Sequence, residues 1–413
     1  MQIAAAGRNR ELNRRILIVR DRPSAGGGIF NYYCALAKHL SLPVHFVDVG
    51  KAQRFYFRGK SPMVRITLIR LIIDWLILAV KIIQIRPDLV HINPGLDSER
   101  FRALRRDAVN VWIARLFRRP VLVFWRGWNN GWCGMPEFPG GNDSLLCWIY
   151  KRANAHIVLA KAFEQDLRRW GFKSPIFLET TVASQEIIDR APAHRSGRSR
   201  PVHLLFLSRV EVEKGIFELL EAFLVLQQRN PDAYTLTIAG DGPDLERLQD
   251  TVTKRGGRNI SFPGLVDGEK KIRCYLEAGI FCFLSYTEGM PNAVLEAMAM
   301  GLPIVSSDAG GLRDILGDGT TGFIVQPVKG APPRQRFNPV EVADTIERLA
   351  RDPELYERIS AHNAAYARER FAAPKVARRL ESIYHSILGG TLDEAGSPAA
   401  TANLISSTES TRL

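Results

Sequence analysis

The sequence predicts an α/β protein built from two doubly wound parallel sheets. Short apolar runs alternate with longer helical patterns through most of its 413 residues. The alternation lapses at residues 185–200, a polar stretch rich in Arg, Ser and Pro, and then restarts. The predicted organisation is a first domain at 1–184, a linker at 185–200, a second domain at 201–372, a closing helix at 373–388 and a disordered tail at 389–413.

Each domain is predicted to contain six parallel strands, and each strand is a short run of aliphatic or aromatic residues. In the first domain the predicted strands are 15–20, 44–49, 89–93, 121–125, 155–160 and 176–178. In the second they are 204–207, 235–239, 260–262, 280–284, 304–306 and 323–325, followed by two or three helices over 338–388. Because sheets of this kind bind ligands at the carboxyl ends of their strands, we expect the site in a cleft between the two domains.

The longest apolar stretch, residues 66–85, is long enough to span a membrane. At 100° per residue, however, Arg70, Asp74, Lys81 and Gln84 fall within one stripe about 80° wide. The stretch is therefore predicted to be an amphipathic helix with one face in water. Such a helix either packs on the core of a soluble domain or lies at a membrane interface, and it does not cross the bilayer.

The net charge of +13 is distributed unevenly along the chain. Residues 1–200 hold 33 Lys and Arg against 15 Asp and Glu, whereas residues 201–413 hold 23 against 28. The first half also holds all seven tryptophans. A basic, Trp-rich half predicts an anionic partner such as a membrane surface, a phosphorylated lipid or a nucleic acid.

The cysteines and the first residues predict a cytoplasmic protein. The five cysteines are an odd number without a CxxC pair, which is typical of reduced thiols. Residues 1–15 carry charges but no apolar run that would form a secretory signal. No DxD-type motif follows a predicted strand, so we expect neither a metal ion nor a resident cofactor.

Three stretches of the second half place polar groups at successive strand ends. In SRVEVEKG, at 208–215, Arg209 and Lys214 accompany a strand-to-helix turn, which suits a diphosphate, although both cations could simply be solvated. In the stretch at 286–301, Glu288 lies in a loop and Glu296 in the following helix, and paired carboxylates suit sugar hydroxyls. The third stretch, at 307–312, is another Gly-containing loop and is a weak signal alone. Together they predict a site for a sugar nucleotide.

These motifs, in order, closely resemble the C-terminal domain of the retaining GT-B glycosyltransferases of family 4. The resemblance rests on SRVEVEKG, TIAGDGP, SFPG, YTEGMPNAVLEAMAMGLPIVSSDAGG and TTGFIVQP, and is strong over residues 203–328. Glu288 and Glu296 match the two glutamates of the family's E-x7-E motif. The resemblance implies a GT-B fold, in which two Rossmann-like domains face each other across a cleft and the second domain binds the donor.

The resemblance also implies roles for individual residues of the second domain. Arg209 and Lys214 would hold the leaving diphosphate, Glu288 would contact the transferred sugar, and Glu296 would bind the ribose. The remaining donor-binding positions would be Gly289, Met290, Pro291 and Asn292 for the sugar and phosphate, and Leu265 and Val266 for the base. Ser208 departs from the glycine more common in the family, and we expect it to be tolerated.

In the first domain the similarity is weaker but in register. Gly27 and Gly28 resemble the family's glycine-rich first loop near the reaction centre, or are simply a flexible turn. Arg126 stands where many relatives have a histidine. An arginine stays charged and cannot act as a general base, so Arg126 would hold an acceptor phosphate or help the leaving diphosphate.

Three further residues are candidates for acceptor binding. His91, at the end of a predicted strand, either takes part in the site or is structural. Trp128 and Trp132 belong to a loop in which tryptophans could stack on a lipid-linked saccharide or pack on one another as a lid.

The sequence thus predicts a metal-independent, retaining glycosyltransferase of bacterial cell-surface polysaccharide synthesis. Its partners would be a UDP- or GDP-linked sugar donor, a glycan or polyprenyl-diphosphate-linked acceptor, and the anionic inner face of the plasma membrane. The alternatives are a GT-B epimerase or hydrolase of sugar nucleotides and an inactive binding subunit. Nucleic acid is not expected as a partner, because no nucleic-acid motif accompanies the basic charge.

Overall fold

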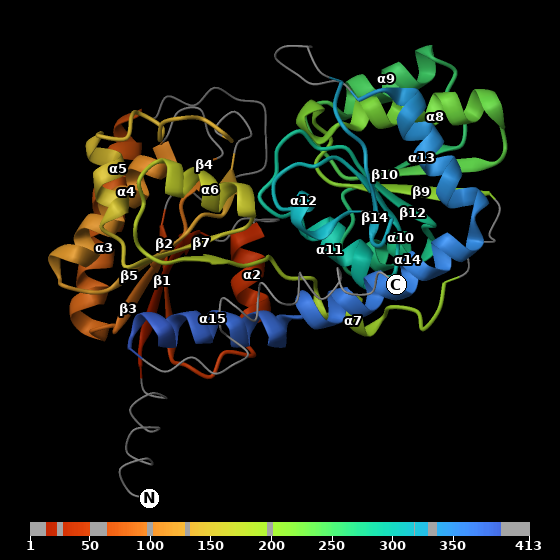
Figure 1. Cartoon of the computed structure of the whole chain (residues 1–413). Coiled ribbons are helices and arrows are strands. Elements are labelled where there is room, and N and C mark those ends of the chain that lie inside the picture. The colour runs from red at the N-terminus through yellow and green to blue at the C-terminus, as the bar shows by residue number, and fades with distance from the viewer. Residues whose placement is uncertain are drawn as a thin grey trace, which may run out of the picture. The chain divides into compact units, whose positions relative to one another are not determined.

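The computed structural model describes residues 14–22, 28–49, 64–96, 102–128, 133–195, 201–317, 319–328 and 337–389, with the backbone alone at 64–70 and 102. The chain divides into two compact units (Figure 1). The described part of unit 1 runs from residue 14 to Thr180 and from Ala373 to residue 389. Unit 2 runs from Thr181 to Ala372.

Unit 1 is built on a six-stranded parallel sheet with the order β2-β1-β3-β5-β7-β8. Its strands are β1 Ile16–Asp21, β2 Val44–Val49, β3 Leu89–Ile92, β5 Val121–Phe124, β7 Ala155–Val158 and β8 Ile176–Leu178. The helices are α2 Gly28–Leu36, α3 Val64–Ile85, α4 Arg102–Leu116, α5 Leu145–Lys151, α6 Lys161–Arg169 and α15 Ala373–Ile387. A two-residue ladder joins β4 Gly95–Leu96 to β6 Gly127–Trp128 beyond the ends of β3 and β5.

Unit 2 contains a second six-stranded parallel sheet, with the order β11-β10-β9-β12-β13-β14. Its strands are β9 Val202–Leu207, β10 Tyr234–Ala239, β11 Ile260–Gly264, β12 Ile280–Phe283, β13 Ile304–Ser306 and β14 Gly322–Ile324. Its helical elements are α7 Gln185–Asp189, η2 Val212–Lys214, α8 Ile216–Arg229, α9 Leu245–Lys254, α10 Gly268–Glu277, α11 Asn292–Ala299, α12 Leu312–Ile315, α13 Pro339–Arg351 and α14 Pro353–Arg370. All twelve predicted strands are present. The central ones, such as β3, β5 and β12, are fully buried, and a strand buried on both faces has a continuous apolar sequence.

The segment predicted to be a linker is largely part of unit 2. Residues 185–189 form α7, in which Ile187 and Ile188 are buried. Arg195 donates hydrogen bonds to the carbonyl of Met300, at the end of α11, and to that of Tyr275, in the last turn of α10. The linker prediction is therefore wrong for residues 185–195: the apolar pair packs, and Arg195 satisfies helix carbonyls that would otherwise lack partners. Residues 196–200 lie outside the described residues.

The C-terminal helix α15 returns to unit 1 and does not simply close unit 2. Arg379 makes two hydrogen bonds to the buried carboxylate of Glu179, at 2.5 and 3.0 Å. Glu381 accepts hydrogen bonds from the backbone and hydroxyl of Ser41.

The preceding helices α13 and α14 each begin with a proline, and the side chains of Asn338 and Asp352 cap their N-termini. The predicted tail falls almost wholly outside the described residues.

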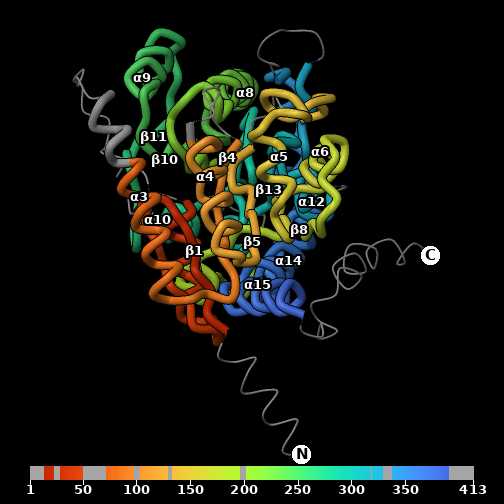
Figure 2. Tube along the Cα trace, turned by 90° about the vertical axis from the view of Figure 1, so that its left-hand side faces the viewer, coloured from red at the N-terminus to blue at the C-terminus, as the bar shows by residue number. Residues whose placement is uncertain are grey.

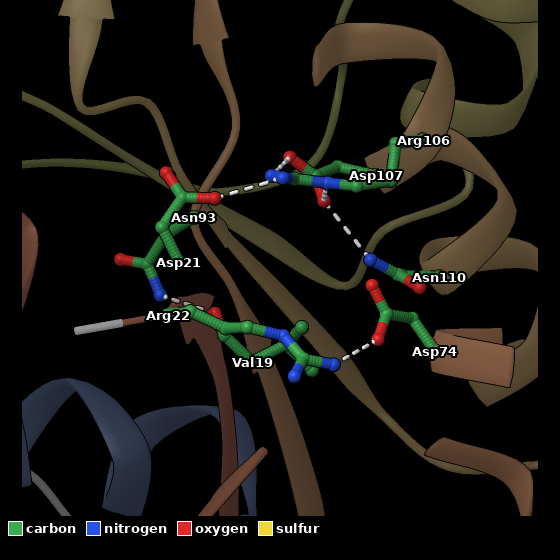
Figure 3. A network of polar contacts seen from close by, with 8 residues as sticks. All are labelled: Val19, Asp21, Arg22, Asp74, Asn93, Arg106, Asp107 and Asn110. Carbon is green, nitrogen blue, oxygen red and sulfur yellow. Dashed lines mark hydrogen bonds and ion pairs between the residues drawn. The ribbon is translucent and has the colours of Figure 1, made fainter. Parts of the chain in front are cut away.

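Ion pairs fasten the carboxyl end of β1 to two helices of unit 1 (Figure 3). Arg106, on α4, bridges Asp21, at the end of β1, to Asp107. Arg22 donates a hydrogen bond to Asp74, on α3. Asp74 was predicted to lie on a face in water, and that prediction is wrong, since only 1% of the residue is exposed. Among the helices of the described residues, none is long and apolar enough to cross a membrane.

Two buried histidines make the stability of unit 1 sensitive to acid. Burial lowers the pKa of both His91 and His156 from 6.5 to about 3. At pH values between about 3 and 6.5, the two histidines are protonated in the unfolded chain but neutral in the folded chain. The free energy of unfolding therefore falls as the pH drops below 6.5. We expect the free energy of unfolding to be about 2–3 kcal/mol lower at pH 5.5 than at pH 7.5.

Denaturant titrations followed by tryptophan fluorescence measure this effect, because all seven tryptophans lie before residue 171, in unit 1. The variant His156→Asn should reduce the pH dependence to about half, since one titrating group remains. An unfolding free energy that does not change between pH 7.5 and 5.5 would contradict this account.

Candidate active site

The first predicted motif forms a tight turn between β9 and α8. Its residues 212–214 form the short helix η2, and Gly215 follows with φ +67°. A Cβ atom at Gly215 would lie 2.0 Å from the carbonyl oxygen of Leu284, just after β12. Only glycine therefore fits, and the close approach brings η2 against the loop that follows β12.

Hydrogen bonds hold these two loops together. The backbone N–H of Tyr286 donates to the carbonyl of Glu213 at 2.8 Å, and the Ser285 hydroxyl donates to the same oxygen. Lys214 Nζ lies 2.7 Å from Oε1 of Glu288, and both side chains are largely buried. The structure thus brings together two of the predicted catalytic residues from different strand ends.

The third motif, at 307–312, contacts the backbone of Glu288 and Gly289. Gly310 has φ +57°, and a Cβ atom there would lie 2.1 Å from the carbonyl oxygen of Glu288. The N–H of Gly311 donates to the carbonyl of Gly289 at 2.8 Å. The weak glycine signal at 307–312 therefore marks a close contact between two backbones.

The loop that carries Glu288 leads directly into α11. Pro291 has φ −76° and precedes the first helical residue, Asn292. The carbonyl of Met290 accepts a hydrogen bond from Thr181 at 3.2 Å, while Gly289 is fixed by Gly311. The first turn of α11 has backbone N–H groups without partners inside the helix, and such groups suit phosphate oxygens.

Glu296 lies within α11 and has a separate set of partners on α10. Its Oε1 is 3.0 Å from Lys271 Nζ, and its Oε2 accepts from the Tyr275 hydroxyl at 3.0 Å. Burial and the nearby Glu296 carboxylate raise the pKa of Tyr275 well above its usual value, so this hydroxyl stays protonated and donates. Lys271 and Tyr275 were not identified from the sequence, because nothing in KKIRCYLE alone shows which helical face meets α11.

We expect Glu296→Ala to weaken nucleotide binding about 10- to 100-fold, because a charged hydrogen-bond acceptor is worth roughly 1.5–3 kcal/mol. Tyr275→Phe keeps the carboxylate but removes one of its donors, so it should produce a smaller loss. Calorimetric titration with UDP and GDP measures both. Unchanged affinity of Glu296→Ala for a nucleotide that the wild type binds would contradict this role.

The remaining residues predicted to bind the donor are Arg209, Leu265 and Val266, which follow β9 and β11. The Arg209 side chain is 70% exposed and lies 3.0 Å from Glu211. Leu265 is exposed and Val266 is buried, directly after β11. Arg209 is therefore available to an anionic ligand, and Leu265 can offer an apolar surface to a base.

In unit 1, Arg126 lies just beyond the carboxyl end of β5. Only 9% of the residue is exposed, and its guanidinium lies over the rings of Tyr32 and Phe124, 4.0 and 4.3 Å from their centres. Among the described residues, nothing forms a hydrogen bond with its buried Nη1 atom. A buried cation without such a partner is costly, which favours a role in binding an anion.

His91 does not support the predicted role in acceptor binding. It is fully buried, and its Nε2 and Nδ1 lie 3.2 and 2.8 Å from the hydroxyls of Tyr33 and Tyr384. Both ring nitrogens are therefore occupied within unit 1, and the structural interpretation of His91 holds. Tyr384 comes from α15, so sequence distance concealed this contact.

Trp128 is likewise a core residue. It is 2% exposed and stacks on Phe163 and Trp170, with ring centres 4.3 and 5.6 Å away. A ring system that is almost fully buried cannot stack on a sugar, and the prediction that Trp128 binds the acceptor is wrong. Gly28 is the first residue of α2, whereas Gly27 and Trp132 lie outside the described residues.

No cluster of three or more acidic, His or Cys side chains suitable for a metal ion occurs within the described ranges. The polar groups gathered in unit 2 are instead cations, carboxylates and helix N–H groups at the ends of β9, β12 and β13. This combination can bind a ligand that carries both phosphates and hydroxyls.

Comparisons with known proteins agree with this geometry. Residues 191–366 match the family model described as Glycosyl transferases group 1. The chain is 33% identical over 190 residues to the alpha-D-kanosaminyltransferase of Streptomyces kanamyceticus, covering 46% of each chain. It is 29% identical over 236 residues to the putative teichuronic acid biosynthesis glycosyltransferase TuaC of Bacillus subtilis, covering 56% of each. The chain thus spans about half the length of these relatives.

The fold is also that of known structures. The crystal structure of HepE from Anabaena in complex with UDP and glucose aligns with a TM-score of 0.62 at 16% identity. The alignment covers 91% of this chain and 100% of that one. The predicted GT-B fold, with two Rossmann-like units, is confirmed.

Proposed function

We propose that this chain, whose residues 191–366 match the family model described as Glycosyl transferases group 1, transfers a sugar from a nucleotide-diphosphate sugar to a glycan or polyprenyl-diphosphate-linked acceptor. The observation that carries the proposal is the largely buried pair of Lys214 and Glu288, 2.7 Å apart beside the start of α11. A cation and helix N–H groups suit a diphosphate, and a carboxylate suits sugar hydroxyls.

The proposed reaction retains the anomeric configuration. The acceptor oxygen attacks the anomeric carbon on the face from which the diphosphate departs. The bond from this carbon to the phosphate oxygen breaks as the new glycosidic bond forms, and the departing phosphate oxygen takes the acceptor proton. Lys214 and Arg209 stabilise the charge that develops on the diphosphate, so no general base and no metal ion are needed.

The proposed donor is a UDP- or GDP-linked hexose. In support, the similar HepE structure contains UDP and glucose. In this proposal Glu296 binds the ribose hydroxyls, and the segment around Leu265 and Val266 binds the base.

The proposed role is in bacterial cell-surface polysaccharide synthesis at the cytoplasmic face of the plasma membrane. Teichuronic acid and capsular polysaccharide glycosyltransferases are among the similar proteins. The net charge of +18 in residues 1–200 supports an anionic surface or acceptor as the partner of this half.

A donor screen with purified protein and a membrane extract tests the proposal. The expected product is an acceptor increased in mass by one sugar, with the anomeric configuration of the donor. Epimerised or free sugar formed without an acceptor would identify an epimerase or hydrolase. Nucleotide binding without turnover of any donor would identify a binding subunit.

A further inference from the structure

One side of helix α3 exposes large apolar side chains at the surface of unit 1. Among its residues 71–85, the exposed large apolar side chains are Ile72, Ile73, Leu76, Ile77, Val80 and Ile83. At 100° per residue these six fall within a stripe about 140° wide. Soluble proteins seldom expose a contiguous apolar stripe of this kind without a partner for it.

The opposite face of α3 explains this orientation. Asp74, Leu78 and Ile82 recur at intervals of four residues and are buried. The Asp74 carboxylate faces inward and pairs with Arg22 (Figure 3). This ion pair and the burial of Leu78 and Ile82 fix the rotation of the helix, so the side that carries the six exposed apolar residues faces outward.

The two helices that follow α3 also expose large apolar side chains. Helices α3, α4 and α5 lie side by side on one side of unit 1 (Figure 2). Trp112 and Leu116 on α4, and Leu145 and Trp148 on α5, are exposed. The rings of Trp112 and Trp148 are 5.8 Å apart, and the Arg152 guanidinium lies 4.1 Å from the centre of the Trp148 ring. We call the exposed side chains of these three helices the α3–α5 face.

The charge of the α3–α5 face is positive. Among the described side chains of the three helices, the only acids are Asp74 and Asp107, and both are buried in ion pairs with arginines. The exposed charged side chains on these helices and directly after them are all basic: Lys81, Arg86, Arg105, Arg115, Arg118 and Arg152. Asp143, two residues before α5, is also exposed and offsets one of these charges. An apolar surface bordered by cations and tryptophans matches the interface of an anionic bilayer.

We propose that the α3–α5 face docks unit 1 onto an anionic membrane, with α3 lying in the interfacial plane. The charge argues against a second copy of the chain as the occupant, because a symmetric pairing of these faces would set cation against cation. The inference identifies the surface for the membrane partner proposed above. It does not depend on the transfer reaction, so binding can be measured even if no sugar is transferred.

Vesicle co-sedimentation of the full chain tests this proposal. The wild type should bind vesicles of phosphatidylcholine with phosphatidylglycerol at least tenfold more strongly than vesicles of phosphatidylcholine alone. The double variant Leu76→Glu/Ile83→Glu should bind the anionic vesicles at least tenfold more weakly. The control for each of the two substitutions is Val340→Glu, which places one negative charge at an exposed aliphatic position on α13 of unit 2 and should change binding less than twofold.

A charge variant provides a second measurement. Arg115→Glu should weaken binding to anionic vesicles about fivefold or more, whereas Lys254→Glu, at an exposed position of α9 in unit 2, should have little effect. Unchanged vesicle binding by the double variant would overturn the proposal, as would failure of the wild type to bind. A wild-type dimer in sedimentation velocity that the double variant dissociates, without vesicle binding, would assign the face to a second copy instead.

Discussion

Lys214→Ala is expected to lower kcat by on the order of 10²- to 10³-fold, because it removes a preorganised cation from the site proposed for the leaving diphosphate. The lysine is largely buried, lies 2.7 Å from Glu288, and is held in place by the close contact of Gly215 with Leu284. A cation fixed in this way needs little reorganisation as charge develops on the diphosphate. Steady-state kinetics with the donor found in the screen measure the effect.

Loss of Lys214 also leaves the Glu288 carboxylate without this partner, so stability must be measured in parallel. Lys214→Ala/Glu288→Gln removes both charges and should unfold at a temperature closer to that of the wild type than the single variant does, while remaining inactive. The control, Lys254→Ala, removes an exposed cation of α9 and should leave kcat unchanged. Turnover of folded Lys214→Ala within threefold of the wild type would exclude this role for the lysine.

The sequence predicted the fold well because local signals determine it. The central strands of the two large sheets, such as β3, β5 and β12, are short and fully buried, and parallel strands buried on both faces require apolar runs. The donor-site motifs were also visible, because the loops that follow β9, β12 and β13 depend on glycines whose positions are set by backbone contacts. Gly215 and Gly310 cannot be replaced without a clash, because a Cβ atom would lie 2.0 and 2.1 Å from the carbonyl oxygens of Leu284 and Glu288.

The first half was harder to interpret because its residue types suit both a core and a binding site. His91 and Trp128 are common ligand-binding residues, yet the former is enclosed by Tyr33 and Tyr384 and the latter by Phe163 and Trp170. These partners are distant in sequence, and Tyr384 belongs to the C-terminal helix.

The position of Asp74 on α3 was misjudged for a related reason. A helical pattern identifies two faces but does not show which of them is buried. Asp74 points inward because Arg22, at the end of β1, pairs with it there. Periodicity alone carries no information about such a partner, so Asp74 was assigned to the face in water, whereas Lys81 and Gln84 of the same predicted stripe are exposed as expected.

Replacement of Arg126 by methionine is expected to separate activity from stability. Transfer should fall by on the order of 10²- to 10³-fold if the guanidinium binds a substrate phosphate. The unfolding free energy of unit 1 should fall by no more than about 1 kcal/mol, and can rise, because burial of a cation costs several kcal/mol and stacking on aromatic rings returns only about 0.5–2. Tryptophan fluorescence in denaturant measures the second quantity, since all seven tryptophans lie in unit 1.

The surroundings of the guanidinium favour a role in binding over a structural one. It lies over Tyr32 and Phe124, and its buried Nη1 has no hydrogen-bond partner among the described residues. The structural arginines Arg379 and Arg22 each pair with a buried carboxylate, Glu179 and Asp74, whereas no ion pair of Arg126 with a carboxylate occurs among the described residues. The matched control is Arg348→Met, because Arg348 lies 4.7 Å from the centre of the Phe323 ring but is exposed on α13, and it should change neither activity nor stability appreciably. Arg126→Met could instead destabilise unit 1 by several kcal/mol and leave the turnover of the folded fraction intact. That result would identify Arg126 as a structural residue and contradict its proposed role in binding a substrate phosphate.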